Sequence, residues 1–239
     1  MPDRDALVAA ARAARGEGDL WDSGRVAGDA TTQVPYAGRA LPARTDAYWR
    51  VQVWDEQNAV SAWSETARFR LGLAGEGDWT AQWIAAQDAT PLHTRRDTLH
   101  LPPARHFRTE FAAKKPVARA TLYASALGIY DAHLNGARIG DAYFQPGWAD
   151  YRQRAHYRAH DVTSQIQTGT NALGFVLADG WYAGYVGYGL LVGYGPEKSG
   201  RNFYGKTPAL RAQLEIDYTD GTRDVIASGP DWRVTSEGP

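Results

Sequence analysis

Alternation of apolar and polar residues indicates β-strands along most of the chain. In the clearest run, 210–218, every second residue is Leu, Ala, Ile or Tyr, and the residues between them are Arg, Gln, Glu and Asp. This period of two is that of a strand. Shorter segments predict further strands at 49–53, 67–71, 107–111, 118–126 and 129–134. Residues 171–177 form a short apolar run, which is typical of a strand buried on both faces.

Turn signals separate these strands. Asn135-Gly136 and Asp220-Gly221 predict two-residue hairpins, because such turns need positive φ angles. The polar residues 55–58 predict another turn between two strands. Residues 5–15 fit a short helix, with a remnant strand over 7–14 as the alternative, and helical periodicity is missing from residue 20 onward. The sequence therefore predicts an all-β protein with at most one short helix near its start.

A glycine-rich, acidic segment at 72–78 interrupts the strand pattern. It predicts a boundary between one domain over 1–73 and a second over 74–239. Within the second domain, residues 183–206 hold many glycines and tyrosines. This stretch is too rich in glycine for a core strand, so we expect a long functional or structural loop over one edge of a sandwich.

Composition excludes several classes of function. The 239 residues carry a formal net charge of -1, which gives no electrostatic basis for binding nucleic acid or an anionic membrane surface. Cysteine is absent, so disulfides, thiolate metal sites and a cysteine nucleophile are excluded. No apolar run approaches the roughly 20 residues of a membrane span. Arg12 and Arg15 interrupt the Ala-rich start of the chain, which is unlike a signal peptide and predicts a cytoplasmic location for the sequence as written.

Carboxylates gather at the predicted turns, namely at Asp131, Asp141, Asp150, Asp161, Asp179 and Asp220. A glycosidase needs two carboxyl groups, about 5 Å or about 6.5–9.5 Å apart, but most of these residues sit where aspartate belongs for turn chemistry. The same oxygens are candidate ligands for a structural calcium ion, although EF-hand spacing is missing. His156 and His160 have the i, i+4 spacing of a helical metal pair. Both histidines lie in a predicted strand or loop rather than on a helix. We therefore favour the interpretation that they are surface or turn histidines.

Tryptophan and tyrosine are unusually frequent, at 9 and 13 residues. Most of these rings should belong to the core, but four of them flank turns and have aspartates beside them. A ring on a loop can stack on the apolar face of a sugar while carboxylates bind its hydroxyls. The candidates for carbohydrate binding are Trp148, Asp150, Tyr151, Asp179, Trp181 and Tyr182. The alternative is that Trp148 and Trp181 plug the ends of the core.

Two ordered sets of motifs resemble the N-terminal, non-catalytic region of bacterial α-L-rhamnosidases, glycoside hydrolase family 78. The first set is similar to the fibronectin-like module that opens such enzymes, and it comprises 21–26, 34–38, 48–55 and 61–64, with 79–84 at the junction to the next module. The second set resembles the family's N-terminal β-sandwich domain, and it comprises 126–130, 134–136, 140–141, 146–151, 161–163, 169–171 and 179–182. The order and spacing of the motifs, over nearly the whole chain, carry the resemblance.

The resemblance implies a partial fibronectin- or immunoglobulin-like module, 1–73, followed by a jelly-roll β-sandwich, 74–239. It implies that the chain alone is inactive and supports a helical-barrel catalytic domain, absent from this sequence, that hydrolyses terminal α-L-rhamnosides. No catalytic residue carries over. Two departures imply a fragment, because the family's opening strand would precede Met1 and closing strands of the sandwich would follow residue 239. Some modules resembling this sandwich bind L-rhamnose with calcium, which is the alternative function.

Overall fold

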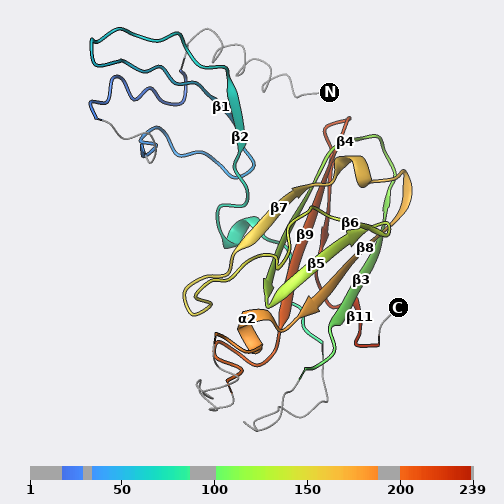
Figure 1. Cartoon of the computed structure of the whole chain (residues 1–239). Helices are drawn as coiled ribbons and strands as arrows, with labels where there is room; N and C mark the ends of the chain where they lie inside the picture. The colour runs from blue at the N-terminus through green and yellow to red at the C-terminus, as the bar shows by residue number, and fades with distance from the viewer. Residues whose placement is uncertain (1–17, 29–33, 87–100, 188–199, 238–239) are drawn as a thin grey trace. The chain divides into compact units, whose positions relative to one another are not determined.

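The computed structural model describes residues 18–28, 34–86, 101–187 and 200–237 (Figure 1). The predicted helix at 5–15 lies outside the described residues, as does the part of the glycine- and tyrosine-rich stretch at 188–199. The chain divides into two compact units, Met1–Asp78 and Trp79–Pro239. The division falls at the end of the glycine-rich segment 72–78. None of the described helices is long and apolar enough to cross a membrane.

The first unit contains one antiparallel strand pair, β1 (Asp46–Trp49) and β2 (Ala67–Arg70), followed by the 3-10 helix η1 (Glu76–Asp78). The turn predicted at 55–58 forms between the strands, where Asn58 N donates to Asp55 O and Asn58 has a φ of 61°. This hairpin confirms the β character expected of the unit.

The prediction of a strand over 49–53 was wrong beyond Trp49, where β1 ends. The amides of Val51 and Val53 donate hydrogen bonds to the hydroxyls of Ser64 and Ser61 at 3.1 Å. The amides of Ser64 and Ser61 still donate to Val51 O and Val53 O, so each pair keeps one backbone bond and replaces the other with a side-chain bond. The alternation of apolar residues therefore continues in the sequence while the regular strand stops.

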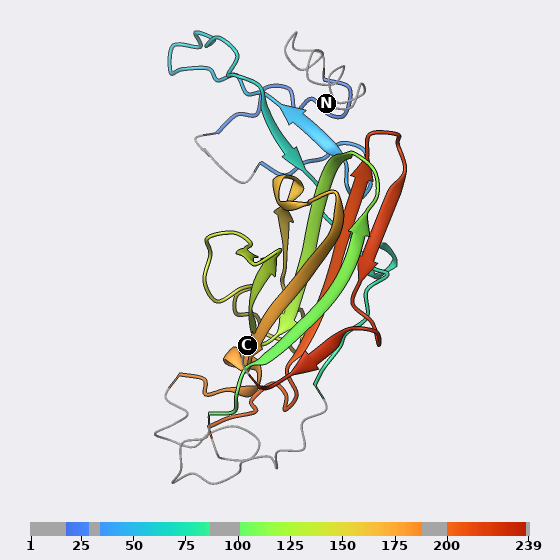
Figure 2. The same cartoon turned by 90° about the vertical axis from the view of Figure 1, so that its right-hand side faces the viewer.

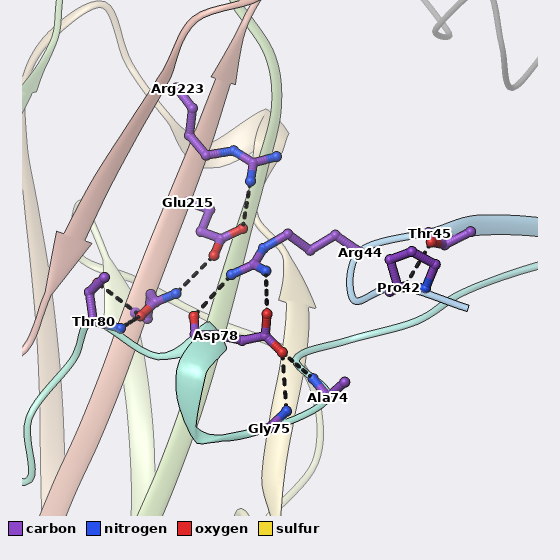
Figure 3. Close-up of polar contacts among 10 residues, drawn as sticks. Pro42, Arg44, Thr45, Ala74, Gly75, Asp78, Thr80, Glu215 and Arg223 are labelled. Atoms are coloured by element: carbon purple, nitrogen blue, oxygen red, sulfur yellow. Dashed lines mark hydrogen bonds and ion pairs between the residues drawn. The ribbon is translucent and has the colours of Figure 1, made fainter. Parts of the chain in front are cut away.

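A carboxylate closes the acidic break at 72–78 into a turn. Asp78 accepts hydrogen bonds from the backbone N–H groups of Ala74 (2.8 Å) and Gly75 (3.1 Å), and Arg44 bonds it at 3.1 Å (Figure 3). The bond from Ala74, supported by those from Gly75 and Arg44, lowers the pKa of Asp78. The segment that marks the boundary is thus a structured turn rather than an open linker.

The second unit is a sandwich of two antiparallel sheets, with the strand orders β10-β9-β4-β7 and β11-β3-β8-β5-β6 (Figures 1 and 2). Its strands are β3 (Arg105–Ala113), β4 (Val117–Leu127), β5 (Ile129–Leu134), β6 (Ala137–Arg138), β7 (Tyr157–Asp161), β8 (Gly169–Ala178), β9 (Ala209–Tyr218), β10 (Arg223–Ala227) and β11 (Arg233–Thr235). Its short helices are η2 (Thr163–Gln165) and α2 (Gly180–Ala183). The all-β class and the sandwich are confirmed.

The core lies between the two sheets and uses the inward positions of their central strands. On β9, Leu210, Leu214 and Ile216 are completely buried, as the alternation of this strand predicts. Leu122 of β4 and Phe175 of β8 join the same cluster. β8 alternates between buried and half-buried residues, so the expectation that it is buried on both faces was wrong. Only one face of this antiparallel sheet packs on the core.

The polar side of β9 is covered rather than solvated. Gln213 Oε1 accepts hydrogen bonds from the amides of Thr80 (2.7 Å) and Ala81 (3.2 Å), and its amide group donates to buried Glu215. Glu215 also pairs with Arg223 at 3.5 Å. A period of two identifies the two faces of a strand, but it does not distinguish a solvated face from one covered by a satisfied polar network.

Both predicted hairpin turns form. Asn135 and Gly136 have φ angles of 53° and 84° between β5 and β6, and Gly221 has a φ of 83° between β9 and β10. Asn135 also donates to Asn171 Oδ1 (2.8 Å) and accepts from Ala172 N (2.9 Å). The Asn-Gly turn is therefore tied to the start of β8, and its role here is structural.

Candidate functional site

Three segments meet at one end of the sandwich: the loop 139–156 between β6 and β7, the α2 turn after β8, and residues 200–208 before β9. The strand register places them together. Ile129 at the start of β5 pairs with Ala178 at the end of β8, and Leu127 at the end of β4 pairs with Ala209 at the start of β9. We call this the loop end, and α2 marks it in Figure 1.

Two glycines allow close packing at the loop end. Gly128 has a φ of 139°, and a Cβ at this position would lie 2.4 Å from Ala178 O. Gly180 has a φ of 50°, and a Cβ there would lie 2.7 Å from Ile129 Cγ2. Glycine tolerates both the backbone conformation and the close contact. This packing fixes the first turn of α2, which carries Trp181.

Asp179 is held between two buried arginines. Arg105 at the start of β3 bonds Asp179 Oδ1 at 2.9 Å, and Arg201 bonds Oδ2. The three side chains are at most 13% exposed, so water is largely excluded from the paired charges. Asn202 N also donates to Ala183 O at 3.2 Å. These three side chains, which we call the aspartate clamp, therefore join β3, α2 and the segment 200–208.

The loop 139–156 is anchored in its middle. Gln145 O accepts a hydrogen bond from Tyr130 N at 2.7 Å, and Pro146 O accepts one from Arg158 Nε at 3.2 Å. Phe144, just before this anchor, has a φ of 57°. The left-handed region costs a non-glycine residue about 1–2 kcal/mol. The anchor thus keeps Phe144 at the surface although its backbone conformation is unfavourable.

Three aromatic side chains form a patch at the loop end, the aromatic ledge, made up of Phe144, Trp148 and Trp181. The rings of Trp148 and Trp181 stack with their centroids 6.2 Å apart and 16° between their planes. Phe144 packs edge-on against Trp181 at 6.1 Å, and the guanidinium of Arg138 lies 4.6 Å from the ring centre of Tyr143. Tyr143, Phe144 and Trp148 are 76%, 62% and 54% exposed. Trp148 therefore does not plug the core.

The two candidate tyrosines belong to a half-buried cluster. Tyr151 packs edge-on against Tyr182 and Tyr204, with ring centres 5.3 Å and 5.2 Å apart. Its hydroxyl donates to Gly147 O at 3.4 Å, and burial raises the pKa of Tyr151 to about 12. Gly205 has no room for a side chain, because a Cβ would overlap the Tyr182 ring. The cluster packs the three segments of the loop end together.

Five of the six carboxylates at the predicted turns have bonding partners within the protein. Asp150 accepts hydrogen bonds from Arg152 N (3.2 Å) and Gln153 Nε2 (3.1 Å) within its own turn. Ion pairs or turn bonds engage Asp131, Asp161, Asp179 and Asp220. Within residues 18–28, 34–86, 101–187 and 200–237, no group of three His, Asp or Glu side chains is placed to hold a metal ion. Turn chemistry and ion pairing account for these five aspartates, and no such bond is found for Asp141 among the described residues.

His160 packs under the start of the loop 139–156. Its Nε2 lies 3.5 Å from Tyr130 Oη, and a Cβ on Gly140 would lie 3.4 Å from its Nδ1. Burial, followed by the charge of Arg158, lowers the pKa of His160. His156 is exposed just before β7. His156 thus fits the favoured interpretation of a surface histidine, whereas His160 does not, because it is half-buried on β7.

The structure distributes the six candidate residues among different roles. The two tryptophans lie on the ledge, the two tyrosines in the tyrosine cluster, one aspartate in the clamp and the other in a turn. Their binding of sugar stays a prediction. The sequence interpretation missed Phe144, although it adjoins the motif at 146–151. It also missed Arg105 and Arg201, for which the sequence holds no signal because the clamp joins segments far apart in the chain.

Two family models match the chain. The α-L-rhamnosidase N-terminal domain matches residues 115–239, and the Rha78A-like N-terminal immunoglobulin domain matches residues 6–75. An α-L-rhamnosidase of Alteromonas sp. (strain LOR) is 36% identical over 224 residues, which cover 92% of this chain and 23% of the relative.

Solved structures show the same likeness. The crystal structure of Streptomyces avermitilis α-L-rhamnosidase complexed with L-rhamnose matches with a TM-score of 0.76 and 27% identity, over 94% of this chain and 36% of that chain. The α-L-rhamnosidase from Dictyoglomus thermophilum matches with a TM-score of 0.76 and 28% identity, over 98% of this chain and 24% of that chain. The chain thus spans 23% to 36% of the length of these three proteins.

The Streptomyces relative carries insertions within the matched region. Its alignment with this chain runs over 392 positions, although the chain has 239 residues. Many residues of the relative therefore have no counterpart here, and its complex with L-rhamnose by itself assigns no sugar contact to this chain.

Proposed function

Because the chain belongs to the α-L-rhamnosidase family, whose N-terminal domain matches residues 115–239, we propose that it forms the non-catalytic N-terminal part of an α-L-rhamnosidase. The complete protein hydrolyses terminal α-L-rhamnose from glycosides. The two carboxylates of that chemistry lie outside the present sequence. The sandwich supports the catalytic domain, a helical barrel.

The observation that carries the proposal is the family match combined with the relatives' greater length. About two thirds or more of each of the three relatives lies outside the matched region, which is ample room for a catalytic domain. The aspartates at the turns of the sandwich support the same conclusion. A glycosidase needs two carboxyl groups that are available to the substrate, whereas Asp150, Asp179 and Asp220 are already bonded within the protein.

Hydrolysis of an aryl α-L-rhamnoside tests the proposal. We expect the purified 239-residue chain to release no more aryl alcohol than its Asp150→Ala variant, a suitable control because Asp150 is exposed in its own turn. We expect the complete protein, encoded with the in-frame sequence that follows, to be active. Hydrolysis by the 239-residue chain that Asp150→Ala abolishes would place catalysis in the sandwich and contradict the proposal.

A second candidate function is binding of L-rhamnose, assisted by calcium. The stacked pair of Trp148 and Trp181 favours it, because an exposed indole can stack on a sugar ring, and Asp150 lies in the same loop. We expect L-rhamnose to change tryptophan fluorescence more strongly with calcium than without, and Trp148→Ala to remove the change. If neither fluorescence nor heat changes up to tens of millimolar sugar, the affinity is too weak to matter.

A further inference from the structure

We infer that Asn135, in the turn between β5 and β6, is a site of spontaneous deamidation that the folded sandwich keeps closed. The sequence holds four asparagines, and only Asn135 is followed by glycine. Because glycine has no Cβ, its backbone nitrogen is the least hindered in approaching the side-chain carbonyl carbon of the residue before it. The inference concerns the sandwich alone, and it goes beyond the proposed function.

The reaction needs no catalyst and no reactant other than water. Gly136 N loses its proton and attacks Cγ of Asn135, so that a bond forms between these two atoms. The bond from Cγ to Nδ2 breaks, and ammonia leaves with the proton. Water then opens the cyclic imide: attack at Cγ yields aspartate, and attack at the main-chain carbonyl carbon yields isoaspartate, in which the main chain runs through Cγ. Both products carry a carboxylate in place of a neutral amide.

The folded chain binds both ends of the Asn135 side-chain amide. Nδ2 donates hydrogen bonds to Gln165 O at 3.0 Å and to Asn171 Oδ1 at 2.8 Å. Oδ1 accepts one from Ala172 N at 2.9 Å, and Asn135 N donates to Ala172 O at 2.9 Å. Ring closure expels Nδ2 and thereby breaks both of its bonds. These bonds therefore raise the barrier to the reaction in the folded state, because they are given up at a half-buried side chain.

The product does not fit the site that the asparagine leaves. An aspartate has no N–H to donate, so a carboxylate oxygen in the place of Nδ2 would face Gln165 O and Asn171 Oδ1, which are both acceptors. Asn171 cannot turn its amide without losing three bonds, because its Oδ1 accepts from Gln167 N and its Nδ2 donates to Gln167 O and Gly169 O. Opposed acceptors repel each other, so the conversion permanently weakens the tie between the turn and the start of β8.

Local opening of the hairpin controls the reaction. β6 has two residues and forms one edge of the sheet β11-β3-β8-β5-β6 (Figure 1). Gly136 is exposed, and a Cβ on it would meet nothing within 4 Å, so water has access to the turn. A short element at a sheet edge opens at a lower free energy than the core strands. The conversion of Asn135 thus reports how often this hairpin opens, and the weakened product opens more often still.

Peptide mapping by mass spectrometry measures the conversion. The 239-residue chain is incubated at mildly alkaline pH, once in buffer and once unfolded in urea. In urea we expect Asn135 to convert first among the asparagines and at least about tenfold faster than in buffer, the factor that corresponds to a closing free energy of about 1.4 kcal/mol. Asn58 is the matched control, because it also lies in a turn at positive φ but precedes an alanine. It should stay unconverted under both conditions over the same time.

The opposite results overturn the inference and leave the proposed function standing. Equal rates for Asn135 in buffer and in urea would show that the fold does not protect it, and equal rates for Asn135 and Asn58 in urea would show that the glycine creates no site. Asn135→Asp should lower the urea midpoint, whereas Asn58→Asp in its exposed turn should not. An unchanged midpoint for Asn135→Asp would show that the product fits. If Asn135→Asp does not fold, the midpoint is measured on the deamidated 239-residue chain, separated by ion exchange through its added negative charge.

Discussion

Removing the carboxylate of the aspartate clamp should destabilise the sandwich severely. Asp179→Ala leaves Arg105 and Arg201, whose side chains are 9% and 6% exposed, without this counter-charge. Breaking a buried ion pair in this way costs about 3–5 kcal/mol, since the remaining charge stays out of water. A domain has about 5–15 kcal/mol of stability in total. At about 2–4 °C per kcal/mol for a unit of this size, the melting temperature should fall by roughly 6–20 °C.

Urea unfolding followed by tryptophan fluorescence measures this loss. The matched control is Glu110→Ala, which removes the 2.6 Å pair with Arg108, an exposed pair worth about 1 kcal/mol or less. A double variant, Asp179→Leu with Arg201→Leu, removes one buried positive charge together with the carboxylate. Its loss in free energy of unfolding should be smaller than the sum of the losses of the two single variants. If Asp179→Ala unfolds at the same urea concentration as Glu110→Ala, the clamp does not hold buried charge and the reasoning fails.

Three further predictions concern the frame around the site. Gly128→Ala should lower the free energy of unfolding by about 1–3 kcal/mol or more, because the new Cβ meets Ala178 O. Gly136→Ala, whose Cβ would have nothing within 4 Å, should lower it only by the strain of positive φ, about 1–2 kcal/mol. Equal urea midpoints for the two variants would contradict the steric argument. Asn135→Ala should cost about 1–3 kcal/mol by the same measurement, since it leaves the Ala172 amide without its side-chain acceptor, while Asn171 keeps its bonds to Gln167 and Gly169. A loss below that of Glu110→Ala would show the bond to be dispensable. The pKa of His160 is lowered in the folded chain by burial and by Arg158, so the unfolded state binds more protons as the pH falls through the usual histidine pKa of about 6.5. This contribution to stability is present above that pH and is lost as the pH falls toward the lowered folded pKa; His160→Gln should reduce the difference between urea midpoints at pH 7.5 and pH 5.5, and an unchanged difference would refute the assignment.

Local residue patterns predicted most of the strands and both hairpin turns. The alternation at 210–218 and the Asn135-Gly136 turn both appear in the structure where the sequence places them. The prediction at 49–53 failed because the hydroxyls of Ser61 and Ser64 take the amides of the opposite segment. Side-chain bonds of this kind leave the period of two intact in the sequence while they end the regular ladder.

The sequence by itself determined the all-β class, the hairpin turns and the likeness to the family, because each depends on residues close together in the chain or on their order. Only the tertiary structure decided which aromatic rings face water and which aspartates are already bonded. Asp179 pairs with Arg105, 74 residues away, and Trp148 stacks on Trp181 from a different loop. Exposure and charge pairing depend on what the fold brings beside a residue, and a one-dimensional pattern does not contain that information.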